Sequence, residues 1–136
     1  MRNIVIDTSL IINHLRKTTD DLNILGALHA NCKANVIVPY EVVVEIFVGT
    51  STKEKVARKL IDETLEKFTL VGLTKKSAMM AGELIRKFPQ IPGPFDLIIA
   101  AISLEHKAQV ATHNPKHFKL IKGLKIWKAQ IMDIRP

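Results

Sequence analysis

Short apolar runs alternate with longer helical segments along this chain, and that alternation limits the fold more than any other feature of the sequence. Five such runs, rich in β-branched or aromatic residues, are typical of buried strands. They cover residues 3–6, 36–38, 68–71, 109–112 and 124–127. Strands separated in this way need crossover connections, and crossovers of about a dozen residues or more build parallel sheets. We therefore expect an α/β fold, with helices on both faces of a parallel sheet.

The segments between the runs place apolar residues at the spacing of one helix face. Leu10, Ile11 and Leu15 predict a first helix. Further helices are expected over residues 22–32, 42–48, 56–65 and 78–88, with Thr74 as N-cap of the last of these, and one more helix begins at Asp96. The stretch "FPQIPGPFD" (88–96) is rich in proline and glycine but short enough to be a loop between two helices. We expect a single domain over residues 1–136, because this length suits one hydrophobic core.

Composition excludes several classes of protein. Hydrophobic residues make up 47% of the chain and charged residues 24%, which is a balance typical of globular domains. The apolar run "LIIAAISL" (97–104) is far shorter than the roughly 20 residues that span a bilayer, and "MRNIVID" does not resemble a secretory signal. We therefore expect a soluble, cytoplasmic protein. Cys32 is the only cysteine, so neither an internal disulfide nor a thiolate metal site is available.

Positive charge is concentrated in the last quarter of the chain. The formal net charge is +7, and from His106 onward there are seven lysine or arginine residues against one acid, Asp133. Such one-sided charge suits a polyanionic partner, and the commonest one in the cytoplasm is nucleic acid. The alternative is a solvated basic face that serves only solubility.

Four polar residues stand at the ends of the predicted elements. Asp7 follows the first run, in "IDTSLI", and Asn114 follows the fourth, in "ATHNP". Glu45, in "VVVEIFVG", lies one turn into the helix after the second run, and Asp96, in "PFDLIIAAIS", begins the helix before the fourth run. In open parallel sheets the working crevice lies at the carboxyl ends of the strands. We expect these four side chains to meet there.

Each of the four residues also has a structural explanation. Asp7 suits a helix N-cap, Asp96 suits the positive end of a helix dipole, and Asn114 before Pro115 suits a turn. Glu45 suits an exposed helix position, although its apolar neighbours leave little helix surface facing solvent. Three carboxylates gathered in one crevice would repel each other, which should raise the pKa of at least one of them. A cation should therefore bind among them.

The types of side chain at this crevice indicate which cation it would be. Carboxylate and amide oxygens suit Mg²⁺ or Mn²⁺, and the scarcity of cysteine and histidine at ligand spacing disfavours zinc. A divalent ion lowers the pKa of a bound water and neutralises charge on a phosphoryl oxygen. The pattern therefore predicts metal-assisted hydrolysis of a phosphodiester bond.

Four stretches of the sequence resemble, in order and spacing, the motifs of PIN domains, and most closely those of the VapC-type toxins of type II toxin–antitoxin pairs. They are "VIDTSLIINHLR", "VVVEIFVG", "FDLIIAAISLEH" and "VATHNPKHF". The resemblance covers nearly the whole chain. It implies a three-layer α/β/α sandwich with a five-stranded parallel sheet, and Mg²⁺- or Mn²⁺-dependent endoribonuclease activity. It also implies a cognate antitoxin as partner and a homodimer.

The resemblance assigns roles to particular residues. Asp7, Glu45 and Asp96 would be the metal ligands, and Asn114 would take the fourth catalytic position. Thr8, Ser9 and Thr112 would support these ligands, and Lys116, Lys119 and Lys122 would contact RNA.

Two positions depart from the motifs. Asn114 is neutral where relatives often carry aspartate, which would weaken a second metal site. His117 stands where many relatives carry aspartate before the phenylalanine of the last motif. We expect His113 and His117 to be surface residues or phosphate contacts rather than general bases.

Two other functions compete with a nuclease. One is an RNA-binding or interaction module whose site no longer cuts. The other is a phosphoryl-acceptor enzyme using Asp7, which is disfavoured because Ser9 stands where such sites carry a second acid. Phe118 and Trp127 could stack on bases as aromatic residues do in single-strand binders, but packing in the core is favoured for both.

Overall fold

The computed structural model of the protein describes residues 2–15, 34–49 and 53–128. The helix predicted over residues 22–32, which includes Cys32, lies outside these ranges.

The described strands form one parallel sheet in the order β3-β2-β1-β4. They are β1 (Arg2–Ile6), β2 (Ala34–Pro39), β3 (Thr69–Val71) and β4 (Gln109–Ala111). At the place of the predicted fifth strand, Ile126 makes a single parallel bridge to Val110, where the Trp127 N–H donates to the Val110 carbonyl over 2.8 Å. The fifth segment therefore extends the sheet beyond β4, but by one residue pair only.

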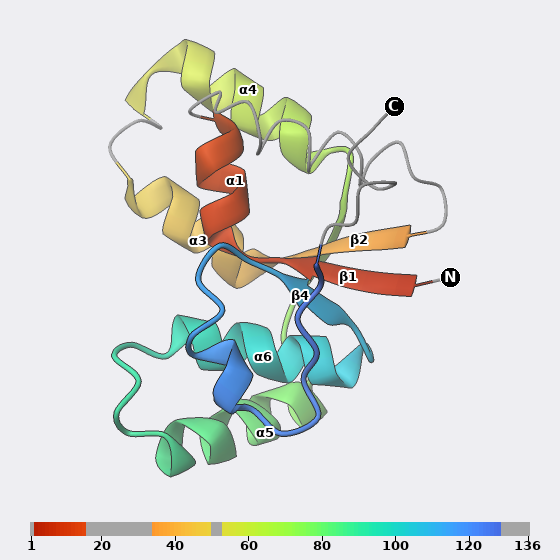
Figure 1. Cartoon of the computed structure of the whole chain (residues 1–136). Helices are drawn as coiled ribbons and strands as arrows, with labels where there is room; N and C mark the ends of the chain where they lie inside the picture. Colours follow the sequence, from red (N-terminus) through yellow and green to blue (C-terminus); the bar gives the residue numbers. More distant parts are fainter. Residues whose placement is uncertain (1, 16–33, 50–52, 129–136) are drawn as a thin grey trace.

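Helices cover both faces of this sheet, as the sequence predicts (Figure 1). Figure 1 shows α1, α3 and α4 on one face and α5 and α6 on the other. Their bounds are α1 (Thr8–Leu15), α3 (Tyr40–Val48), α4 (Lys55–Leu65), α5 (Lys75–Lys87) and α6 (Phe95–Glu105), and a short 3₁₀ helix, η2 (Phe118–Leu120), follows β4. Thr74 is the N-cap of α5, and its hydroxyl accepts the Ser77 N–H over 3.2 Å. No helix in the described part of the chain has the length and apolar character of a membrane span.

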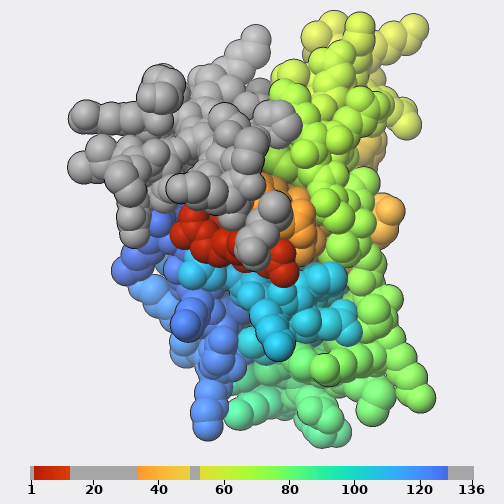
Figure 2. Space-filling view, turned by 90° about the vertical axis from the view of Figure 1, so that its right-hand side faces the viewer, coloured from red at the N-terminus to blue at the C-terminus, as the bar shows by residue number. Residues whose placement is uncertain are grey.

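The core lies on both sides of β1. Ile4, Val5 and Ile6 have no exposed surface, as expected for a central strand covered on both faces. Figure 2 views the molecule from the end at which the strands begin, and there β1, in red, lies between β2 in orange and α6 in cyan. Phe118 (1% exposed) and Trp127 (7% exposed) belong to this core. The prediction that both aromatic residues pack rather than stack on bases is confirmed.

Candidate functional site

The four predicted site residues line one pocket at the carboxyl ends of the strands. Asp7 comes directly after β1, Asn114 lies in the loop after β4, and Glu45 and Asp96 lie on α3 and α6. The pocket has a volume of about 450 Å³ and is lined by Asp7, Thr8, Ser9, Ile12, Glu45, Asp96, His113 and Asn114. The topology thus brings together residues that are up to 107 positions apart in the sequence.

Asp7 is held rigidly at the base of this pocket. Its backbone N–H donates to the Ala111 carbonyl over 3.0 Å, which continues the pairing of β1 with β4. One carboxylate oxygen accepts the Thr8 N–H over 2.8 Å. The other accepts from the hydroxyl groups of Thr112 over 2.7 Å and Ser9 over 3.2 Å. The Asp7 side chain accepts the first N–H of α1, whereas a capping side chain accepts the second or third, so N-capping does not account for this carboxylate.

Glu45 is half-buried and connects α3 to α1. Its Oε1 accepts the Thr8 hydroxyl over 2.7 Å. Glu45 is therefore not an exposed helix residue that would need no functional explanation. The Thr8, Ser9 and Thr112 side chains, predicted to support the acids, each contact Asp7 or Glu45.

Asp96 pairs with His117. The His117 Nδ1 lies 2.8 Å from the Asp96 Oδ2, and each side chain is 29% exposed. Asp96 also lies in the first turn of α6, where Pro94 provides no capping side chain and a negative charge is favourable by about 0.3–1 kcal/mol. The expectation that His117 is a surface residue or phosphate contact missed this pairing, because the two residues are 21 positions apart and no periodicity links them.

The loop after β4 is anchored to α1. The His113 N–H donates to the Ser9 hydroxyl over 3.1 Å, and the Asn114 N–H donates to the Thr112 hydroxyl over 2.9 Å. The bond to Thr112 uses the Asn114 backbone rather than its side chain, and Asn114 also lines the pocket. Its side chain is exposed at the pocket mouth.

The pKa values of Asp7 and Glu45 are raised mainly by burial, and the repulsion between carboxylates that the sequence predicts adds to the shift. Burial raises the pKa of Asp7, and the negative charge of Asp96 raises it further, against the hydrogen bonds from Thr112, Thr8 and Ser9. Burial also raises the pKa of Glu45, as do the charges of Asp7 and Asp96, while the Thr8 hydroxyl opposes the shift. The pocket therefore carries negative charge that its own hydrogen bonds do not fully compensate.

The donor types fit a divalent metal ion, although the acids do not form a closed cage. Within residues 2–15, 34–49 and 53–128, no three histidine, cysteine or acidic side chains are close enough to hold an ion as they stand. Thr8 engages one oxygen of Glu45, and His117 engages one oxygen of Asp96. Mg²⁺ commonly keeps several waters and uses one or two carboxylates, so an open set of oxygen donors suits it.

Comparisons with known proteins place this geometry in context. The family model described as PIN domain matches residues 4–124. A search of curated proteins found no match.

Several solved structures share the fold. A chain of VapBC2 from Rickettsia felis, bound to a DNA fragment from their promoter, is 24% identical with a TM-score of 0.78, over 93% of this chain and 99% of that chain. DNA-bound VapBC from Salmonella typhimurium is 18% identical with a TM-score of 0.78, over 93% and 98%. A toxin–antitoxin complex from Klebsiella pneumoniae is 20% identical with a TM-score of 0.71, over 89% and 94%.

Proposed function

Because this chain belongs to the PIN domain family, we propose that it is a metal-dependent endoribonuclease that hydrolyses phosphodiester bonds in RNA. The observation that supports this most is the convergence of Asp7, Glu45 and Asp96 on one pocket, where burial raises the pKa values of Asp7 and Glu45 and the neighbouring carboxylates raise them further. Uncompensated carboxylates at the carboxyl ends of parallel strands are what a cation site requires.

Each residue of the pocket has a definite part in this proposal. Asp7, Glu45 and Asp96 would hold Mg²⁺ or Mn²⁺, which supplies an activated water and neutralises phosphoryl charge when bound. Three hydrogen bonds fix the orientation of the Asp7 carboxylate, and Thr8 fixes that of Glu45. Asn114 lines the open side of the pocket, where its neutral amide can contact a phosphate without repelling it.

We further propose that the chain is the toxin of a toxin–antitoxin pair, acts in the cytoplasm as a single domain, and forms a homodimer. The solved VapBC and toxin–antitoxin complexes with this fold support a protein partner. Exposed apolar side chains on α3 and at the start of α4 offer a surface for such contacts. They are Val44 (50% exposed), Val48 (78%) and Val56 (82%).

A non-cleaving RNA-binding module is the second candidate. It is favoured by the pairing of Asp96 with His117, which occupies one oxygen of that carboxylate, and by the neutral Asn114, which adds no negative charge to the pocket. Binding to RNA without cleavage would then be the whole activity.

Cleavage of single-stranded RNA separates these two functions. Wild-type protein and the Asp96→Asn variant are incubated with labelled RNA in Mg²⁺, in Mn²⁺ and in EDTA, and the products are separated on a gel. We expect cleavage only by the wild type and only with metal, while the variant still binds RNA. Asp62→Asn, which removes an exposed acid of α4 that does not line the pocket, is the control and should cut normally. Equal cleavage by Asp96→Asn would contradict the proposal.

Metal binding should also be visible as thermal stabilisation. An ion that binds only the folded state stabilises it by about 2.7 kcal/mol at a hundred times its Kd, so Mg²⁺ should raise the melting temperature. In His117→Ala the Asp96 Oδ2 loses its partner, so half-maximal stabilisation should require less Mg²⁺ than in wild type. His106→Ala, outside the pocket, should match the wild type. A melting temperature that does not respond to Mg²⁺ or Mn²⁺ would favour the non-cleaving module.

A further inference from the structure

A second pocket adjoins the acidic one. Its volume is about 750 Å³, and it is lined by Asp96, His113, Asn114, Pro115, Lys116, His117, Lys119 and Leu120. Asp96, His113 and Asn114 line both pockets, so the two share a wall formed by the loop after β4 and the start of α6. Lys116 and Lys119, two of the three lysines expected to contact RNA, line this pocket, whereas Lys122 does not.

The second pocket combines apolar and basic side chains. Leu120 is 48% exposed, although Phe118, two residues before it, is buried in the core. A 3₁₀ helix has about three residues per turn, so η2 directs Phe118 inward and Leu120 outward. Lys116 and Lys119 are exposed beside it. Proteins that bind single-stranded nucleic acid combine a basic groove with aromatic side chains on which bases stack; here the aliphatic Leu120 and Pro115 supply the apolar surface beside the lysines.

Hydrogen bonds hold this pocket in shape without a ligand. The Lys119 N–H donates to the Pro115 carbonyl over 2.9 Å, and the Leu120 N–H donates to the His117 carbonyl over 3.2 Å. His117 itself is tied to Asp96, which places an imidazole beside the carboxylate that the two pockets share. Binding here therefore costs little ordering of the protein backbone.

We propose that this second pocket is a subsite for one nucleotide of single-stranded RNA, next to the phosphodiester bond that lies in the acidic pocket. Leu120 and Pro115 contact the base, and Lys116 and Lys119 contact the flanking phosphates. Because Asp96 lines both pockets, a nucleotide seated in the second directs its neighbouring phosphate toward the first. This inference rests on the proposed function in taking RNA as the ligand and in placing a phosphodiester bond in the acidic pocket.

Binding of abasic RNA tests the contact with the base. Fluorescence anisotropy in EDTA measures the Kd of short labelled single-stranded RNAs that carry one abasic nucleotide at successive positions. At one position the missing base should weaken binding to wild type severalfold, by less than the loss of stacking on an aromatic side chain would give. Leu120→Ala should weaken the binding of intact RNA by a similar factor. The Kd of this variant should then not change further when the base at that position is removed, because both changes remove the same contact. Met79→Ala, on α5 and 61% exposed, is the control and should behave as wild type.

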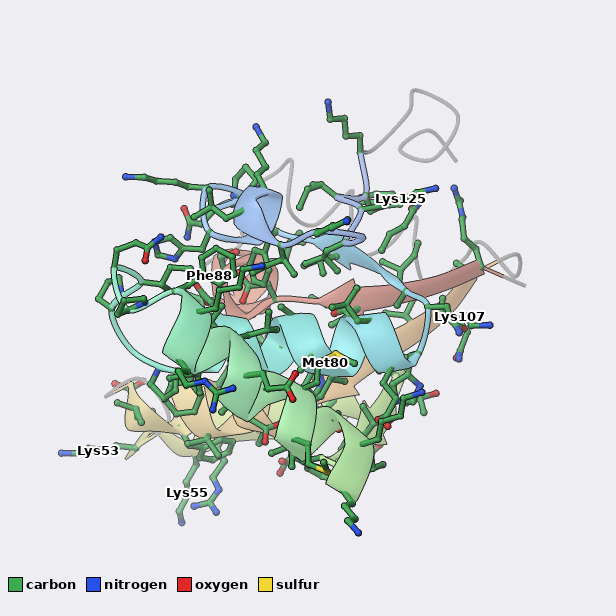
Figure 3. All side chains as sticks on the ribbon, turned by 90° about the horizontal axis from the view of Figure 1, so that it is seen from below. Lys53, Lys55, Met80, Phe88, Lys107 and Lys125 are labelled. Atoms are coloured by element: carbon green, nitrogen blue, oxygen red, sulfur yellow. The ribbon has the colours of Figure 1, made fainter. Side chains whose placement is uncertain are left out.

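The phosphate contacts are tested by the salt dependence of the same Kd. Each phosphate contact to single-stranded RNA contributes about −0.7 to the slope of log K against log salt, so Lys116→Gln and Lys119→Gln should each reduce the slope by about that amount. Lys107→Gln is the matched control. Lys107 lies beyond the C-terminal end of α6, roughly 15 Å of helix away from Asp96, and its side chain projects outward in Figure 3.

The outcomes separate this subsite from the nuclease proposal, because binding is measured without metal. The subsite is overturned if the losses of affinity caused by Leu120→Ala and by the abasic nucleotide add together. It is also overturned if all lysine variants have the same salt slope. Both outcomes hold even if the protein cuts RNA. The coupled losses in a protein that does not cut would support the subsite and contradict only the nuclease.

Discussion

Replacing Asp7 with asparagine is expected to lower RNA cleavage by more than about a hundredfold while making the metal-free protein more stable. The loss of activity follows because Asp7 is the most buried of the three acids and the one with the most hydrogen bonds holding its carboxylate in the pocket. The gain in stability follows because folding of the wild type buries the negative charge of Asp7 near Asp96, whereas the neutral asparagine avoids that cost. A single change should therefore move activity and stability in opposite directions.

The stability effect of Asp7 depends on pH with a definite sign. Burial raises the pKa of Asp7 in the folded state above its ordinary value of 3.8. Below pH 3.8 both the folded and the unfolded state are protonated at this carboxyl group, so it costs no stability. As the pH rises from there through the raised pKa, the unfolded state loses its proton first and the folded state becomes less stable. Above the raised pKa the destabilisation is constant.

Thermal unfolding in EDTA, from acidic to neutral pH, measures this difference. Asp7→Asn should melt above the wild type at neutral pH, and the gap should close as the pH falls toward 3.8. The amide keeps an oxygen for the Thr8 N–H, and its NH₂ group can donate to the hydroxyl groups of Ser9 and Thr112. Asp62→Asn should show no such gap. If Asp7→Asn melts below the wild type at neutral pH, the hydrogen bonds outweigh the cost of burying the charge.

That Asp7, Glu45 and Asp96 line one pocket could be predicted because it depends largely on topology. Once the runs at 3–6 and 36–38 are strands of one parallel sheet, the residues that follow them must lie at the same edge. Helix starts were predictable for a similar local reason, as the Thr74 cap of α5 shows. Such local patterns can be recognised from a few neighbouring residues in the sequence.

The partners of the acids could not be predicted in the same way. The bonds from Thr8 to Glu45 and from His117 to Asp96 depend on how α1 meets α3 and how the loop after β4 returns to α6. No spacing in the sequence encodes those distances. The one available signal was the departure at position 117, where a histidine replaces the aspartate of related motifs.

The second pocket was also beyond the reach of the sequence. Leu120 stands among apolar residues that include Phe118 and Ile121, and nothing in their order says which of them remains exposed. Both Phe118 and Ile121 are buried, at 1% and 4% exposure, while Leu120 is not. The 3₁₀ turn decides this, because three residues per turn place positions 118 and 121 on one face.

Replacing Phe118 with alanine should lower the free energy of unfolding by about 3–5 kcal/mol, the largest stability effect expected of any single change proposed for this chain. The ring is among the largest fully buried side chains, and its removal would leave a cavity between η2 and the core. Urea unfolding should show a lower midpoint with an unchanged m-value. Phe47→Ala, at a ring of α3 that is 36% exposed and 5.6 Å from Arg58, should cost about 1 kcal/mol or less.

The same ring also connects stability to the site. Phe118 lies between His117, the partner of Asp96, and Lys119, which lines the second pocket. Phe118→Leu keeps most of the buried volume and should cost less than about 1.5 kcal/mol, so it stays folded and shows the effect on RNA binding alone. We expect its Kd for RNA to rise only slightly, because η2 keeps its anchor. A large rise in Kd with little loss of stability would mean that the ring contacts RNA directly, which would contradict its place in the core.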